Sequence, residues 1–183
     1  ITSVKYADSH LNIQLDGYLQ WVNNYIFDQP TGRNITVVSG AYPVFQYRQT
    51  RAFFQGVDLD AHIRPISALD YHLVSAMIWA RELPSHTYLP YIPSFRLTQS
   101  LTWKLPVWKA LQPKISLNHR FVAKQTRFNP ATDLIPFTPA AYHLMGFEAS
   151  LSVPMREGMS LRMSLMGDNI LNHEYKEYTN RSR

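Results

Sequence analysis

The chain has 183 residues, of which 45% are hydrophobic and 17% are charged, and its formal net charge is +5. This composition is too apolar for a disordered segment and too poor in charge for a typical soluble surface. The absence of cysteine excludes a disulfide scaffold, a thiolate metal site and a cysteine nucleophile. No apolar run approaches the roughly 18–20 residues that a spanning helix needs.

Apolar and polar residues alternate along most of the chain, first over residues 10–27. In that segment Leu15, Leu19 and Trp21 fall on one face, and Gln14 and Asp16 fall on the other. A period of two indicates a strand with one apolar and one wet face. Six further strands are predicted at 44–64, 69–80, 94–105, 113–125, 142–154 and 159–168. Residues 2–7 are interpreted as the end of a preceding strand, and all neighbours are predicted to be antiparallel.

The predicted strands are long, and the connections between them alternate in length. At ~3.3 Å per residue and ~45° tilt, residues 10–27 span roughly 40 Å, which exceeds the ~25 Å apolar band of an outer-membrane barrel. The short connections are 64–68, 106–112 and 154–158, and the long ones are 28–43, 81–93, 126–141 and an open one from 168. Transmembrane barrels have short periplasmic turns and long extracellular loops, so the short set is assigned to the periplasm.

Aromatic residues gather at two levels of the predicted strands. One level, near the long connections, consists of Trp21, Tyr25, Phe27 and Trp79, and the other, near a short turn, consists of Trp103 and Trp108. Two such levels are typical of the aromatic girdles at the two membrane interfaces, although strand propensity alone also enriches aromatic residues.

Several segments resemble the TonB-dependent outer-membrane receptor family. The strand "LNIQLDGYLQWVNNYIF", the segment "PVFQYRQTRAFFQGVDLDAHIRP" and the entry "LPYIPSFRLTQSLTW" are similar to strands of its barrel. The pattern Asn-x-Leu-Asn-x-x-Tyr at Asn169–Tyr175 resembles the family's penultimate strand and last loop. The similarity covers nearly the whole chain, but the family's terminal strand and its N-terminal plug have no counterpart here.

The resemblance implies an all-β fold, an antiparallel transmembrane β-barrel to which this chain contributes about seven of roughly 22 strands. Residues 1–183 are then the C-terminal part of the barrel, without the plug domain and the last strand. The implied function is active transport across the outer membrane of a Gram-negative bacterium, in which TonB supplies energy to import siderophore-iron, haem, a metal or cobalamin. The implied partners are the plug, the TonB complex acting through the plug, outer-membrane lipid, and a small-molecule or metal-chelate ligand. No cofactor and no nucleic-acid partner are expected.

The long connections supply the candidate ligand contacts, because the outer loops of such receptors capture ligand. They are His86 and Tyr88 in one loop, and Arg127, Asn129 and Asp133 in another. Each of them also fits the description of an ordinary solvated loop residue.

Carboxylates and imidazoles share one strand face near a short turn. These residues are Asp58, Asp60 and His62 on one strand, and Asp70 and His72 on the next. Carboxylate and imidazole suit divalent metals, but a charged network with the adjacent Arg64 is the preferred interpretation, because buried charges need partners. No metal site is therefore expected.

Other function classes remain as alternatives. A passive outer-membrane porin would lack a plug, and a soluble β-sandwich binding module would bury its apolar faces between two sheets. No enzyme is expected, because the sequence contains no hydrolase elbow, phosphate loop or zinc-helix motif. The basic residues form no stripe, which argues against a nucleic-acid binder.

Overall fold

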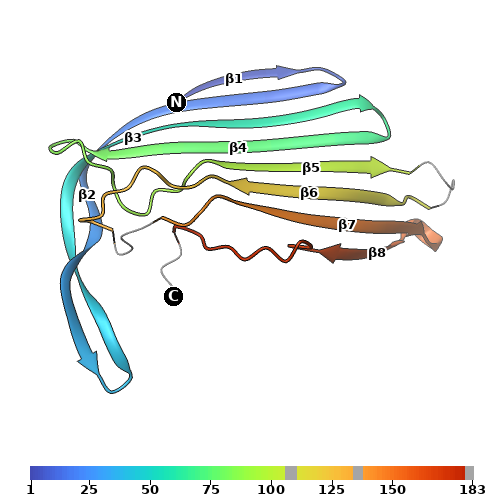
Figure 1. Ribbon diagram of the computed structural model, residues 1–183. Helices are drawn as coiled ribbons and strands as arrows, with labels where there is room; N and C mark the ends of the chain where they lie inside the picture. The colour runs from blue at the N-terminus through green and yellow to red at the C-terminus, as the bar shows by residue number, and fades with distance from the viewer. Residues whose placement is uncertain (106–110, 134–137, 180–183) are drawn as a thin grey trace.

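A computed structural model of the chain describes residues 1–105, 111–133 and 138–179, which form one antiparallel sheet with the strand order β1-β2-β3-β4-β5-β6-β7-β8 (Figure 1). The strands are β1 (Thr2–Ala7), β2 (Leu11–Val37), β3 (Gly40–Ile66), β4 (Leu69–Glu82), β5 (Arg96–Lys104), β6 (Lys114–Val122), β7 (Tyr142–Pro154) and β8 (Ser160–Gly167). A single 3₁₀ turn, Arg156–Gly158, separates β7 from β8. No helix in the described part of the chain is long and apolar enough to cross a membrane.

The seven strands expected from the alternation correspond to β2–β8, and the expected end of a preceding strand corresponds to β1. The antiparallel all-β prediction is thus confirmed. The β1–β2, β3–β4 and β7–β8 connections lie at one end of the sheet, which we call the turn end, whereas the β2–β3 turn, the loop 83–95 and the segment after β8 lie at the other, the loop end (Figure 1). The predicted turn 106–112 lies largely outside the described residues, as does Trp108.

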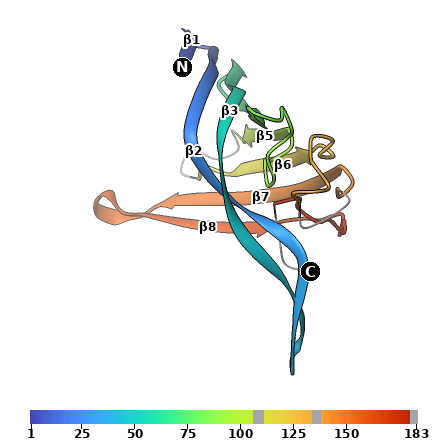
Figure 2. The same ribbon diagram turned by 90° about the vertical axis from the view of Figure 1, so that its left-hand side faces the viewer.

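The predicted long connection 28–43 is wrong, because β2 and β3 stay paired until Val37 meets Gly40. Only residues 38–39 separate the two strands, and the hairpin bends away from the rest of the sheet (Figures 1 and 2). Pro30 suggested a loop, but it stands beside a register shift between Pro30 and Asn34. A bulge of this kind accommodates a residue that has no backbone N–H to donate.

A second register shift, between Val22 and Tyr25, moves the aromatic side chains that follow it in β2 to the opposite face of the sheet. Asn23 and Asn24 together stand opposite one residue of β3, and Asn24 has a positive φ of 61°. The extra residue reverses the alternation. The side chains of Tyr25 and Phe27 therefore lie on the polar face, and the prediction that they belong to an outer aromatic level is wrong.

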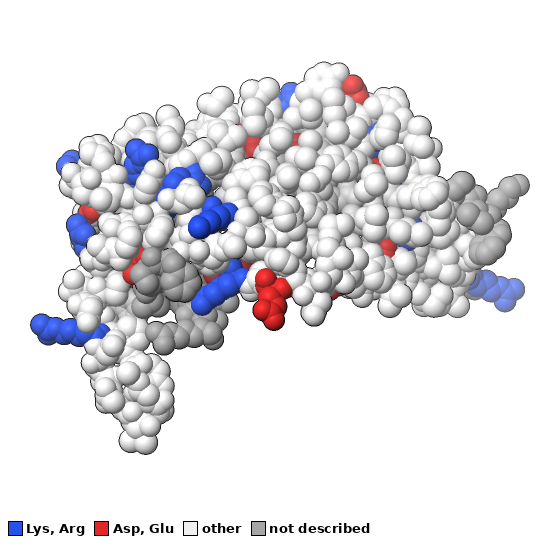
Figure 3. All heavy atoms as spheres, viewed as in Figure 1, with Lys and Arg blue, Asp and Glu red and all other residues white. Residues whose placement is uncertain are grey.

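The two faces of the sheet are continuous across all strands. One row of the apolar face, which we call the outer face, runs through Leu101, Leu117 and Phe147. A row of the opposite, inner face is polar and runs from strand to strand through Asn12, His62, His72, Ser100 and Asn118. On the face seen in Figure 3, Lys and Arg gather mainly toward the loop end, and the broad middle is largely uncharged.

A polar line crosses the outer face, and its groups satisfy one another. The hydroxyl of Tyr71 donates to Oε1 of Gln99 at 2.5 Å, and Nε2 of Gln99 lies 3.3 Å from Nδ1 of His119. Because an amide nitrogen only donates, Nδ1 of His119 accepts, and Nε2 of His119 donates to Nδ1 of His143 at 3.0 Å. This bonding explains how His119 occupies the apolar register.

Candidate ligand-facing surface at the loop end

The loop 83–95 folds over the inner face and is fixed there by an apolar cluster. Its residue Leu89 is 1% exposed and packs with Phe27, Ala52 and Ala80 of the three neighbouring strands. Its backbone N–H donates to the carbonyl of Ala80 at 3.1 Å. The reversed alternation of β2 supplies Phe27 to this cluster, so the bulge is what allows the loop to pack.

A buried carboxylate, Glu82, holds the start of the same loop. Glu82 accepts hydrogen bonds from Arg48 Nη2 at 2.8 Å and from Thr50 Oγ1 at 2.7 Å. From the loop itself it accepts hydrogen bonds from Ser85 Oγ at 2.6 Å and from Thr87 Oγ1 at 3.3 Å. Four donors compensate the burial of this charge, so the first turn of the loop is fixed to β3 and β4.

The segment 123–133 after β6 is tied to the loop 83–95 by Gln125, which is 1% exposed. Its Nε2 donates to the carbonyl of Ile92 at 2.6 Å, and its Oε1 accepts the backbone N–H of Arg127 at 3.0 Å. The guanidinium of Arg127 lies 5.1 Å from the ring centroid of Trp79, which is a cation–π arrangement. Burial lowers the pKa of the Arg127 guanidinium.

Asn129 and Asp133 close a turn within the same segment. The backbone N–H of Asn129 donates to Oδ2 of Asp133 at 3.2 Å, and the N–H of Ala131 donates to Oδ1 of Asn129 at 3.0 Å. The other oxygen of Asp133 accepts the hydroxyl of the buried Tyr178 at 2.6 Å. Desolvation raises the pKa of the Asp133 carboxyl, and burial together with Asp133 raises the pKa of the Tyr178 phenol.

The segment 168–179 continues from β8 toward the loop end beside β7, where the backbone N–H of Ile170 donates to the carbonyl of Met145 at 2.9 Å (Figure 1). Asn169 forms its turn, because its side-chain amide donates to the carbonyl of His173 at 3.1 Å and its oxygen accepts the His173 N–H at 3.0 Å. Further on, Oε1 of Glu177 accepts the hydroxyl of Tyr142 at 3.0 Å. The Asn-x-Leu-Asn-x-x-Tyr pattern therefore forms a turn in which the side chain of its first residue, Asn169, hydrogen-bonds the backbone of His173.

A polar pocket of about 340 Å³ lies between this segment and the strands β5, β6 and β7. Its polar lining consists chiefly of Thr98, Asn118, Arg120, Asp168 and Asn169. The sequence pattern placed the strand residues of this set on the polar face, but it could not show that Asp168 and Asn169 lie beside them.

The five predicted ligand contacts differ in how far the fold already uses them. His86 is exposed at a backbone position with a positive φ of 56°. The hydroxyl of Tyr88 accepts from Arg81 Nη2 at 3.3 Å, and the Arg81 guanidinium lies 5.0 Å from the ring centroid. Arg127, Asn129 and Asp133 have the partners given above. Glu82 and Gln125, which sequence reasoning missed, are the buried residues that position both loops.

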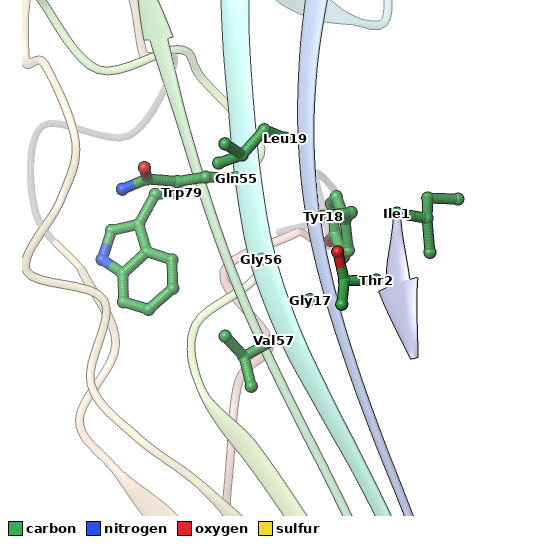
Figure 4. Close-up of a pocket in the computed structure, with 9 residues that line it drawn as sticks. All are labelled: Ile1, Thr2, Gly17, Tyr18, Leu19, Gln55, Gly56, Val57 and Trp79. Carbon is green, nitrogen blue, oxygen red and sulfur yellow. The ribbon is translucent and has the colours of Figure 1, made fainter. Parts of the chain in front are cut away.

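A second groove lies near the open edge of the sheet, at β1 (Figure 4). Its lining includes Leu19, Val57 and Trp79, which come from the adjacent strands β2, β3 and β4. These residues are mainly apolar and continue the outer face, so the groove is part of the surface predicted to contact lipid.

The architecture defines a class of protein. Long antiparallel strands with an apolar outer face and a polar inner face are the wall of a transmembrane-type β-barrel. A family model described as "TonB dependent receptor-like, beta-barrel" matches residues 2–170. The chain therefore belongs to this family, and the resemblance noted in the sequence is confirmed.

The solved structures that resemble the chain include one named "Copper transporter OprC", with a TM-score of 0.78 and 18% sequence identity. The match covers 97% of this chain and 25% of that protein, so the chain spans a quarter of that protein's length. This likeness shows a shared fold. The curated proteins compared with the chain include no match to its sequence.

Proposed function

We propose that the chain is the C-terminal part of the barrel of an outer-membrane receptor that imports a scarce ligand with energy supplied through TonB. In this proposal residues 1–183 form wall only, a plug domain fills the interior against the inner face, and one more strand follows β8. The observation that carries it is a two-faced sheet of long strands within a family match over residues 2–170.

The alternatives fit less well. A soluble β-sandwich requires a second sheet over the apolar face, whereas the described residues form a single sheet whose outer face leaves large apolar side chains such as Leu117 and Trp21 half exposed or more. A passive porin has an open channel, whereas here the loop 83–95 packs over the inner face. We propose no enzymatic activity.

The ligand belongs to the classes that the family resemblance implies: a siderophore-iron complex, haem, a metal ion or cobalamin. Copper joins the panel of test substrates because a protein named as a copper transporter has the same barrel fold. Among the predicted contacts, His86 is the best candidate for touching ligand directly, because its side chain is exposed at the loop end.

The test is growth and uptake in the natural host. A strain that lacks the complete gene is grown with a single iron, haem, copper or cobalamin source, and uptake of the labelled compound is measured with and without TonB. We expect the deletion strain to fail to grow on one of these sources and the complete gene to restore its growth. Uptake of that compound should stop when TonB is absent. Uptake that continues without TonB would identify a passive pore instead.

A matched pair of loop variants tests the site within this chain. His86→Ala is expected to weaken binding of that compound by about tenfold, since loss of one good ligand contact changes the binding free energy by roughly 1.4 kcal/mol. Pro84→Ala, an exposed neighbour in the same loop, should leave binding unchanged. Equal binding by both variants and the wild type would remove His86 from the site while leaving the transport proposal intact.

A further inference from the structure

Three side chains with metal-ligand atoms meet on the inner face near the turn end. Asp60 and His62 lie on β3, and His72 lies on β4 directly opposite His62. Nε2 of His72 is 3.1 Å from Oδ1 of Asp60, and Nε2 of His62 is 3.7 Å from the same oxygen. One ligand atom of each residue lies within 4.8 Å of the others. The strand pairing fixes this spacing, because side chains directly opposite each other in an antiparallel pair have Cβ atoms about 5 Å apart.

The basic side chain next to the cluster, Arg64, pairs with Asp70, so the carboxylate of Asp60 contacts the two imidazoles instead. Arg64, the expected partner of the network, lies with its Nε 3.2 Å from Oδ2 of Asp70. Within the described part of the chain, the close side-chain contacts of the Asp60 carboxylate are with the imidazoles of His62 and His72. The expected Arg64 network therefore neutralises Asp70, and Asp60 keeps its carboxylate for another cation.

A second carboxylate stands behind one imidazole. Oδ1 of Asp70 lies 3.9 Å from Nδ1 of His62, the ring nitrogen opposite the one that faces Asp60. A histidine that binds a metal through one nitrogen commonly presents the other to a carboxylate, which orients the ring. At 3.9 Å this contact is not a hydrogen bond, so Asp70 stands behind the His62 ring and would have to move closer to orient it when a metal binds.

We propose that Asp60, His62 and His72 bind one divalent transition-metal ion on the inner wall of the barrel, with Asp70 orienting His62. Two imidazole nitrogens and one carboxylate oxygen suit Zn²⁺, Ni²⁺ or Cu²⁺ better than Mg²⁺ or Ca²⁺. The side chains of His62 and His72 are 35% and 33% exposed, so an ion can reach them. The rings stack with centroids 3.8 Å apart and planes 11° from parallel, so binding tilts them out of the stack.

This site is separate from the ligand-facing surface. It lies on the part of β3 and β4 next to the turn end, whereas the predicted contacts belong to loops at the loop end. The proposal concerns binding at this position, and it stands whichever compound the receptor imports. It differs from the expectation, drawn from the sequence, that the chain contains no metal site.

The test uses the complete receptor purified in detergent, with Cu²⁺ and Zn²⁺ as the probes. Electron paramagnetic resonance of bound Cu²⁺ reports the coordinating nitrogens, and calorimetry measures Zn²⁺ affinity. The test variant is His62→Gln/His72→Gln. The matched control is His119→Gln/His143→Gln, which removes another stacked cross-strand histidine pair, with centroids 5.3 Å apart, that belongs to no three-ligand group in the described residues. Retention of the folded gel mobility shows that each variant forms the barrel.

The expected result is a Cu²⁺ spectrum with two imidazole nitrogens in the wild type and in the control, which is lost in the test variant. Zn²⁺ affinity should fall at least tenfold in Asp60→Asn and about tenfold in Asp70→Asn, whose carboxylate acts through His62. Asp60→Asn keeps the side-chain shape, so it serves if the double variant fails to fold. Zn²⁺ binding that is absent from the wild type, or equal in the wild type and the variants, would overturn the proposal.

Discussion

Leu117→Arg should lower the free energy of unfolding of the barrel by about 2 kcal/mol. Leu117 is 50% exposed on the outer face, between Leu101 of β5 and Phe147 of β7. It stands two residues along β6 from Ile115, which pairs with Trp103 near the turn end. Two residues advance ~7 Å along a strand, or roughly 5 Å along the membrane normal at ~45° tilt. Arginine costs about 2–4 kcal/mol at the bilayer midplane and about 0–1 near the interface, so an intermediate depth gives the lower end of the first range.

The assay is a denaturant titration of the complete protein, folded reversibly into phospholipid vesicles, with tryptophan fluorescence as the readout. Asn118→Arg is the matched control, because the next residue of the same strand belongs to the polar inner face, where a charged side chain should cost less than it does at Leu117. Ile115→Arg, closer to the interface, should cost about 0–1 kcal/mol. A larger loss for Asn118→Arg than for Leu117→Arg would refute the assignment of the two faces.

Two further predictions concern packing and protonation. Gly56→Ala should lower the free energy of unfolding by about 1–3 kcal/mol, as overpacking does, because a Cβ there would collide with the ring of Tyr18. In the same denaturant titration, Gly17→Ala should change the midpoint little, because its Cβ would meet nothing within 4 Å. Equal effects of the two variants would contradict the close packing of Tyr18 on Gly56. Burial raises the pKa of Asp133, so the closed loop holds the proton more tightly than the open loop does. Its stability should then increase as the pH falls from about 7 towards 4 and decrease as the pH rises through the raised pKa. Hydrogen exchange of the Asp133 backbone amide, corrected for the intrinsic exchange rate, measures the stability of the loop at each pH. Asp133→Asn should remove the pH dependence. Protection that decreases on acidification would argue against the raised pKa as its cause.

The alternation of the sequence was sufficient to predict most of the sheet, because a strand with one face in lipid and the other in a polar interior repeats strictly every two residues. It failed where pairing with the neighbouring strand decides the geometry. Nothing in the spacing of Tyr25 and Phe27 reveals that Asn23 and Asn24 share one partner on β3. The pair of asparagines inside an aromatic run was the available signal, since asparagine tolerates the positive φ that Asn24 adopts.

The hairpin beyond Phe27 was missed for a related reason. Pro30 and Gly32 are ordinary loop residues, and the sequence of one strand does not show that its partner continues beside it. The β-branched residues Ile35, Thr36 and Val37 that follow favour a strand. Weighing them against the proline would have predicted a projecting hairpin in place of an irregular loop.

The loop residues are the part of the site that sequence could not rank. Arg127, Asn129 and Asp133 have the chemistry of ligand contacts, but the fold uses all three to hold the segment 123–133 to Trp79, to itself and to Tyr178. A polar side chain that already has good partners gains little by turning to a ligand, because the hydrogen bonds it breaks offset those it makes. If the proposed transport function holds, we therefore expect exposed loop side chains such as His86 to contact ligand first, while the bonded residues keep the loops in position.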